Sequence, residues 1–262
     1  MQALRHFLLA LQFFTRIPVT GRLADWVGYS PALLRASAGH FPGVGWVVGA
    51  VAAGVLWGAA QGWGAWVAAG LSTAATVWLT GAFHEDGLAD TADGLGGGAT
   101  KARALEIMKD SRIGSYGTVA LVLALGLKLA LVALLLQSRG AAPAALAVGA
   151  AHVLSRLAPL FVMARLPYVA DAAGAKSKPL ADAVSARALA VGVLWSIPAL
   201  AGVGIAVDAL NLAAFIGLWG AAVLFMTRLL RRRLQGFTGD TLGATQQVSE
   251  LALLLGLAWG AV

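Results

Sequence analysis

The sequence predicts an all-α protein, a polytopic membrane helix bundle with about seven transmembrane helices and an N-terminal interfacial helix. Two observations predict this class. Of the 262 residues, 59% are hydrophobic and only 12% are charged, with a mean hydropathy of +0.79, whereas a soluble domain carries roughly 25% charged residues. The charged residues also gather between long apolar stretches. We therefore expect residues 1–262 to form a single integral membrane domain.

Seven apolar stretches have roughly the 17 to 25 residues that an α-helix needs to cross a bilayer. The predicted spans are 43–61, 64–84, 118–136, 143–164, 188–207, 209–230 and 242–261. Within the first span, Gly45 with Gly49 and Gly54 with Gly58 have the spacing that lets two helices approach closely. We expect packing within the chain at these glycines, and a homo-oligomer seam is the alternative.

The N-terminal segment predicts a helix at the membrane surface rather than a signal peptide. Its apolar run is short, contains Gln12, and leads to Arg16 and Pro18 instead of a small-residue cleavage site. Polar and apolar side chains divide between two faces of the predicted helix, as in interfacial helices. Proline cannot continue a helix, so we expect this one to end by Pro18.

Basic residues predict the orientation. Sixteen of the nineteen Lys and Arg residues fall on one side of the predicted spans, and Arg139 alone falls on the other. The positive-inside rule then places the N-terminus in the cytoplasm and the C-terminus outside. Because the net charge of +7 follows from this pattern, we expect a lipid bilayer and no nucleic acid as partner. The sequence has no cysteine, which excludes disulfides and thiolate metal sites.

Residues 84–117 form the segment where chemistry is expected, an acidic hairpin on the cytoplasmic side. Half of the twelve acidic residues lie here. If the second span continues as a helix, Asp86, Asp90 and Asp93 share one face of it. Glu106 and Asp110 repeat the four-residue spacing on a second segment. Glycines at 94 and 96–98 are expected to break the helix and bring the two acidic faces together.

Carboxylates on one face repel each other unless cations lie among them. Oxygen donors without cysteine or histidine favour Mg²⁺, Mn²⁺ or Ca²⁺, and Mg²⁺ often completes its shell with substrate phosphate. Nearby basic residues suit an anionic ligand, and they are Lys101, Arg103, Lys109 and Arg112. The alternative is a solvated loop whose charges only stop translocation.

Ionisable residues inside apolar spans are costly and are usually paired or functional. Arg156 and Glu250 lie at matching depths, so we expect an intramembrane pair, with a cavity that admits substrate as the alternative. Lys128 lines the same cavity or pairs elsewhere. Asp240 lies at the start of the last span, where Asp240 or Thr241 caps the helix or Asp240 contacts substrate.

Two motifs carry a family resemblance. Asp90-x-x-Asp93-Gly94 followed by Glu106-x-x-x-Asp110 resembles a variant of the signature of CDP-alcohol phosphotransferases. Five segments together resemble the adenosylcobinamide-GDP ribazoletransferase family, also called cobalamin 5'-phosphate synthases. They are LQFFTRIPV (11–19), FPGVG (41–45), FHEDGLADTADG (83–94), EIMKDSRIGSYG (106–117) and TGDTLGA (238–244). The segments extend over nearly the whole chain.

The resemblance implies the last assembly step of cobalamin in a bacterial or archaeal cytoplasmic membrane. A hydroxyl of α-ribazole, or of its 5'-phosphate, would attack the diphosphate of adenosylcobinamide-GDP and release GMP, with Mg²⁺ as cofactor. The implied metal ligands are Asp86, Asp90, Asp93, Glu106 and Asp110. Asp110 is also the candidate general base. The candidate substrate and phosphate ligands are Lys109, Arg112, Lys128, Arg156, Asp240 and Glu250.

Two other functions stay open. A CDP-alcohol phosphatidyltransferase of phospholipid synthesis would use the same chemistry on another substrate. A divalent-cation transporter would need ionisable residues distributed across the depth of the membrane. The carboxylates cluster at one predicted membrane exit instead, so transport is the weaker alternative.

Overall fold

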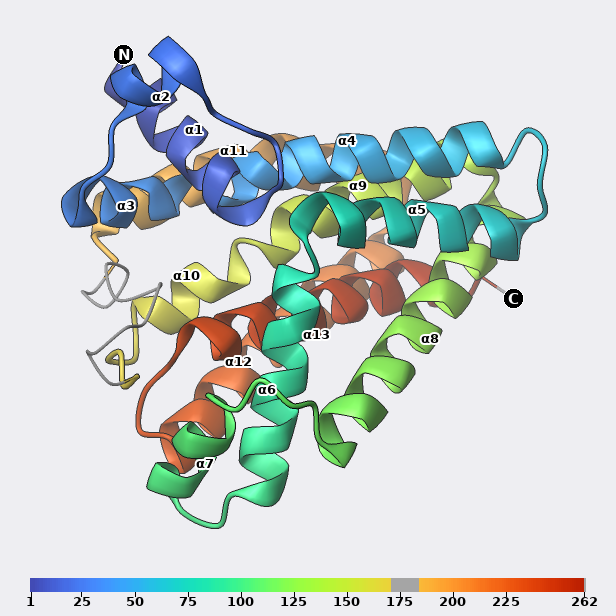
Figure 1. The fold of residues 1–262 in the computed structure, drawn as a ribbon. Helices are drawn as coiled ribbons and strands as arrows, with labels where there is room; N and C mark the ends of the chain where they lie inside the picture. The colour runs from blue at the N-terminus through green and yellow to red at the C-terminus, as the bar shows by residue number, and fades with distance from the viewer. Residues whose placement is uncertain (171–183, 262) are drawn as a thin grey trace.

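The computed structural model describes residues 1–170 and 184–261, and their regular secondary structure is helical (Figure 1). The all-α prediction is therefore confirmed. Lys176 and Lys178, which belong to the predicted charge pattern, lie outside the described residues. The helices are α1 (Gln2–Phe14), α2 (Gly21–Val27), α3 (Pro31–Ser37), η1 (Ala38–His40), α4 (Phe41–Ala59), α5 (Ala65–Thr80), α6 (Phe83–Gly97), α7 (Lys101–Ile107), α8 (Ser115–Arg139), α9 (Ala141–Ser155), α10 (Ala158–Met163), α11 (Ala186–Ala206), α12 (Ala209–Arg233) and α13 (Gly239–Ala258).

Fewer helical stretches than predicted are long and apolar enough to cross a membrane. In the described part of the chain there are five, with a sixth if α5 and α6 are counted as one span bent by 87°. The five are Pro31–Ala59, Ser115–Arg139, Ala141–Met163, Ala186–Ala206 and Ala209–Arg233. The polytopic membrane bundle is thus confirmed, with five or six helices that meet this measure against the roughly seven expected.

The two missing spans have different causes. α5 has only 16 residues, which is short for a span of its own. α13 fills the seventh predicted region, but it carries Asp240, Gln246, Gln247 and Glu250. All four face protein rather than open surface: the last three are buried and Asp240 is half-buried. This helix is therefore surrounded by other helices instead of lipid.

Local sequence signals explain several helix boundaries. The side chains of Ser185, Asp208 and Thr238 each accept the backbone N–H three residues on, at the start of α11, α12 and α13, as N-cap residues do. Pro159 stands near the start of α10, where its missing N–H interrupts the preceding helix. The predicted span 143–164 is consequently broken at Arg156.

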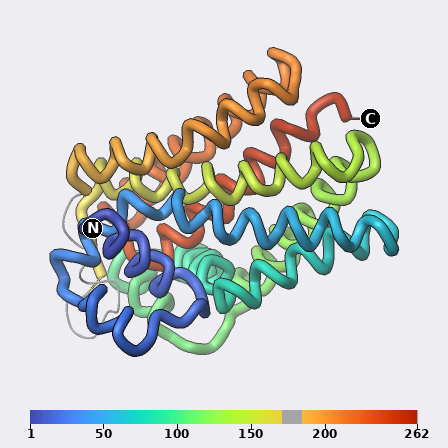
Figure 2. Tube along the Cα trace, turned by 90° about the horizontal axis from the view of Figure 1, so that it is seen from above, coloured from blue at the N-terminus to red at the C-terminus, as the bar shows by residue number. Residues whose placement is uncertain are grey.

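The long helices run side by side, and α13 contacts α6, α8, α9 and α12. The N-terminal helices α1 to α3 lie at one end of the bundle, and the C-terminus lies at the other (Figures 1 and 2). α1 ends at Phe14, before Pro18 as expected. Its last turns cover the end of the bundle where α4 and α6 begin, because Phe14 packs against Phe41 and Phe83.

Two of the paired glycines serve packing within the chain. A Cβ atom added at Gly45 would lie 2.6 Å from the carbonyl oxygen of His152, and one at Gly49 would lie 2.8 Å from that of Gly149. These glycines therefore let α4 approach α9 closely. Gly54 and Gly58 have no other described atom within 4 Å of such a position. The expected packing is thus confirmed for the first pair, and the homo-oligomer seam stays a prediction.

Candidate active site

A sharp bend places the acidic helix. Gly81 and Ala82 have φ angles of 65° and 59°, in the left-handed region that costs a residue with a side chain roughly 1–2 kcal/mol. The backbone N–H of Arg16 donates to the carbonyl of Leu79 at 2.7 Å and ties the end of α5 to the N-terminal segment. α6 leaves at 87° to α5, so the second span does not continue straight into the acidic segment.

α6 confirms that Asp86, Asp90 and Asp93 lie on one continuous helix. The expected helix break comes later than predicted, because α6 includes Gly94 and ends before Gly98. Both glycines serve close packing instead. A Cβ atom at Gly94 would lie 2.6 Å from the Met108 side chain, and one at Gly98 would lie 2.6 Å from the backbone of Ala104. α7 therefore folds back directly onto α6.

A fourth carboxylate joins this face from α13. Thr238 and Thr241 form the capping box of α13, so Asp240 is not the cap. Gly87 packs against the backbone of Asp240, whose oxygen would lie 2.6 Å from an added Cβ atom. Burial, followed by repulsion from Asp86, Asp240 and Asp93, raises the pKa of Asp90 to about 7. Burial and Asp86 also raise the pKa of Asp240.

Asp93 has a structural task as well. Its two carboxylate oxygens accept the backbone N–H groups of Gly114 at 2.7 Å and Gly117 at 2.8 Å. The side chain is buried, and negative charge at a helix N-terminus is favourable. Asp93 therefore fixes the start of α8 against α6. Each carboxylate oxygen keeps a further lone pair for a ligand.

Glu106 and Asp110 lie apart from the α6 carboxylates. Glu106 pairs with Arg103 at 2.8 Å, with both side chains exposed. Asp110 pairs with Arg112 at 2.6 Å, and these hydrogen bonds lower the pKa of Asp110 to about 2. Lys109 is exposed beside them. Because α7 meets α6 through Ala104 and Met108, the two predicted acidic faces do not oppose each other in this structure.

The donor set of α6 and α13 suits a hard divalent cation. Among the described residues, no three His, Cys, Asp or Glu side chains already form a group that could hold a metal ion. Asp86, Asp93 and Asp240 nevertheless repel the ionised form of Asp90, Asp86 does the same to Asp240, and a cation would relieve that repulsion. Oxygen donors of this kind are the ligands that Mg²⁺ prefers. The residues thus fit the predicted metal in chemistry.

A buried polar network lies behind this face and corrects one prediction. Glu250 pairs with Lys128 at 2.6 Å, and both side chains are almost fully buried. Arg156 instead donates to the His152 carbonyl at 2.9 Å and contacts the His152 ring at 3.3 Å. Glu250 Oε2 lies 3.4 Å from His152 Nδ1. The expected direct Arg156–Glu250 pair is therefore replaced by a cluster in which His152 lies between the two.

Two glutamines extend the network to α6. Gln246 donates to Glu250 at 2.6 Å and also contacts Ser155 at 2.9 Å. Gln247 donates to Glu85 at 3.0 Å and to the side-chain oxygen Oε1 of Gln246 at 3.0 Å. Sequence reasoning did not assign roles to these glutamines. Their only signal is their polarity within an apolar span.

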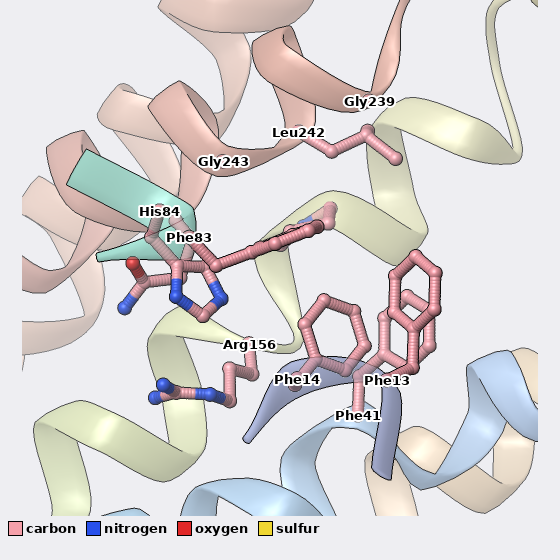
Figure 3. A pocket seen from close by; sticks show the side chains of 11 residues that line it. Phe13, Phe14, Phe41, Phe83, His84, Arg156, Gly239, Leu242 and Gly243 are labelled. Atoms are coloured by element: carbon pink, nitrogen blue, oxygen red, sulfur yellow. The ribbon is translucent and has the colours of Figure 1, made fainter. Parts of the chain in front are cut away.

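A pocket opens next to the acidic face, between α1, α4, α6, α10 and α13 (Figure 3). Phenyl rings form much of its wall, and they come from Phe13, Phe14, Phe41 and Phe83. The rings contact one another with centroids 4.6 to 5.5 Å apart. His84 stacks on Phe14. Arg156 and Gln246 lie at the polar side of the pocket, where the network begins.

Helices long and apolar enough to cross a membrane, a helix face that carries carboxylates and an adjoining aromatic pocket define a multi-pass membrane protein with a polar site. Comparison with known proteins narrows this class. The model of the cobalamin-5-phosphate synthase family matches residues 6–258, and the chain therefore belongs to that family. No solved structure matches the chain.

Curated relatives are similar along the whole chain. Adenosylcobinamide-GDP ribazoletransferase of Polaromonas naphthalenivorans is 56% identical over 98% of this chain and 99% of its own length. The protein of the same name from Albidiferax ferrireducens is 56% identical over 99% of both chains. The one from Leptothrix cholodnii is 53% identical over 96% of this chain and 94% of its own. The resemblance predicted from five segments is thus confirmed.

Proposed function

We propose that this protein joins α-ribazole, or its 5'-phosphate, to adenosylcobinamide-GDP and releases GMP. A ribose hydroxyl oxygen attacks the phosphorus that carries the cobinamide group. A new P–O bond forms to ribazole, and the P–O bond to GMP breaks. The observation that carries this proposal is the shared name of relatives that are more than half identical over nearly the full chain.

We further propose Mg²⁺ as the cofactor, held by Asp86, Asp90, Asp93 and Asp240. When bound, Mg²⁺ would neutralise charge on the diphosphate. The chain itself supplies the rigid frame: α13 packs against α6 at Gly87, and Asp93 holds the start of α8. Fixed donors of this kind bind a cation without having to reorganise.

The remaining predicted roles are proposals that differ in their support. Glu106 stays a predicted metal ligand, although it is exposed and paired with Arg103. Asp110 stays the predicted general base, but a carboxylate with a pKa of about 2 is a weak proton acceptor at neutral pH. Arg112 and Lys109 are exposed in the same loop and suit phosphate contact once substrate arrives.

The buried candidates Lys128, Arg156 and Glu250 are proposed to shape the site from behind rather than to bind phosphate directly. Their side chains already bond within the network, which joins α8, α9 and α13. Gln247 extends the network by donating a hydrogen bond to Glu85, which directly precedes Asp86 in α6. The proposed orientation keeps the N-terminus and the site in the cytoplasm, and a homo-oligomer remains open.

GMP release tests the proposed reaction. Detergent-purified protein receives adenosylcobinamide-GDP and α-ribazole, with either Mg²⁺ or EDTA. We expect GMP and a cobalamin product only with Mg²⁺, and a loss of at least a hundredfold in Asp90→Asn. Asp25→Asn, an exposed carboxylate on α2, is the matched control and keeps full activity. Turnover of a CDP-alcohol by folded protein that releases no GMP would overturn the proposal.

A further inference from the structure

The aromatic pocket is built from four of the five segments that carry the family resemblance, yet no role has been assigned to it above. Phe14, Phe41 and Phe83 come from three of these segments, and Leu242 from a fourth. Residues far apart in the chain thus converge on one apolar wall (Figure 3). A wall of this composition suits a flat, apolar ligand.

We propose that this pocket receives the dimethylbenzimidazole base of the ribazole acceptor. This inference rests on the proposed function, and it adds the subsite that selects the acceptor. The base is an aromatic bicycle with two methyl groups, and it keeps a single ring nitrogen as hydrogen-bond acceptor. Guanine, the other base in the reaction, carries several donors and acceptors, which phenyl walls would leave without hydrogen-bond partners and so disfavour its binding.

The polar side of the pocket matches the single acceptor of the base. Arg156 lines the pocket, is 3% exposed, and its Nε–H has no hydrogen-bond partner among the described residues. One of its two terminal nitrogens, Nη1, is already engaged with His152. The Nε–H of Arg156 could donate to the free ring nitrogen of the benzimidazole while the phenyl rings contact its apolar faces.

The position of the pocket also fits the reaction. His84 in the pocket wall and Asp86 on the acidic face belong to the same first turn of α6. Gly239 in the wall directly precedes Asp240. A base held between these residues leaves its ribose near the carboxylates, where the diphosphate is proposed to bind. The acceptor hydroxyl would thereby be oriented toward the phosphorus, which is how positioning lowers a barrier.

The base enters by displacing one wall. The pocket offers about 30 Å³ to water-sized molecules, enough for one or two waters but too little for a bicyclic ring. Phe83 is 37% exposed, whereas Phe41 is 3% and Phe14 8% exposed. We therefore infer that Phe83, the most exposed of the three rings, is the one displaced, and that Phe14 and Phe41 remain as the stacking surface.

Steady-state kinetics test the subsite. We expect Phe14→Leu and Phe41→Leu to raise the KM for α-ribazole about three- to tenfold, the loss of one or two aromatic contacts, while the KM for adenosylcobinamide-GDP changes less than about twofold. Phe161→Leu, which removes a ring that packs on Trp219 outside the pocket, is the matched control and alters neither KM. Free 5,6-dimethylbenzimidazole should compete with α-ribazole.

Equilibrium binding separates this inference from the proposed reaction. Radiolabelled α-ribazole is measured on the detergent-purified full chain without donor and without metal, so binding is visible even if no turnover occurs. Weaker binding in Phe14→Leu but not in Phe161→Leu supports the subsite. Equal binding in all variants overturns it, as does a rise in the KM for adenosylcobinamide-GDP alone, which would assign the pocket to guanine. Thermal unfolding midpoints of the variants identify any that simply fail to fold.

Discussion

Asp90 shows how a single residue can report on the purpose of a site. Its carboxyl group is half-buried on α6, and it lies within electrostatic range of three other aspartates. In the absence of a cation this arrangement opposes ionisation of Asp90, because burial and like charges both disfavour the charged form. The ionised form of Asp90 is therefore unfavourable in the metal-free protein and becomes favourable when a cation is bound nearby. This makes Asp90 a candidate cation ligand.

The raised pKa of Asp90 predicts how the metal-free protein responds to pH. Its folded-state pKa of about 7 exceeds the unfolded value of about 3.9. The native state therefore holds the proton more tightly, and stability falls as pH rises from about 4 to about 7. In EDTA, the unfolding temperature of the wild type should drop between about pH 4 and pH 7, and Asp90→Asn should lose most of that drop.

Asp25→Asn serves as the control for this pH series. It changes an exposed carboxylate on α2 and should keep the wild-type drop in unfolding temperature. A drop that is equally large in Asp90→Asn would refute the assignment of the pH dependence to Asp90. Addition of Mg²⁺ above about pH 7 should raise the unfolding temperature of the wild type, because a ligand that binds only the native state stabilises it.

The residue scale also shows what the sequence could and could not predict about the site. The spacing of Asp86, Asp90 and Asp93 was sufficient to place them on one helix face, since helix geometry depends only on local sequence. Asp240 was identified only as a cap or a substrate contact. Its approach to α6 depends on packing at Gly87, which lies more than 150 residues away in sequence.

At the scale of helices, apolar runs predicted most positions to within a few residues. The helices α4, α8, α11 and α12 each occupy a predicted span. The bend after α5 was not predictable, because neither a proline nor a strong turn signal marks Gly81 and Ala82. The sequence also did not predict that the last apolar stretch forms a helix buried among other helices. Apolar content alone does not show that α13 lies among other helices, which lets it carry Gln246, Gln247 and Glu250.

The contact between α6 and α8 gives a prediction at this scale. A Cβ atom at Gly117 would overlap the carboxylate of Asp93 and lie 2.9 Å from the backbone carbonyl oxygen of Ala89 on α6, so Gly117→Ala must push the two helices apart. Overpacking of this kind costs roughly 1–3 kcal/mol, and we expect the unfolding temperature to fall by several degrees. Gly126 on the same helix has no other described atom within 4 Å of a Cβ position.

Gly126→Ala is therefore the matched control, and it should be neutral or slightly stabilising, since alanine favours a helix over glycine by roughly 0.5–1 kcal/mol. Unfolding temperatures in detergent compare the two variants under identical conditions. Equal stability of Gly117→Ala and Gly126→Ala would mean that Asp93 does not fix α8. Activity should fall only in Gly117→Ala, because movement of α8 also moves Asp93.

At the scale of the whole molecule, the basic segments and the candidate site lie toward the same end of the helix bundle. The segments richest in Arg and Lys lie toward the end that carries α1 to α3, α7 and the close of α12, whereas the turn after α4 and the C-terminus lie at the other end (Figure 1). The acidic helix α6 and the aromatic pocket adjoin the basic end. A site that receives water-soluble nucleotide substrates is reached most directly from this end.

The proposed orientation gives the last prediction, and the absence of cysteine makes it simple to test. Single cysteines are introduced as Arg103→Cys on α7 and as Gln61→Cys in the turn after α4, both at exposed positions. In intact cells, a membrane-impermeant maleimide should label the protein with Gln61→Cys and leave Arg103→Cys unlabelled. After the membrane is permeabilised, both should react. The opposite pattern in intact cells would place the acidic site outside the cytoplasm and contradict the positive-inside argument.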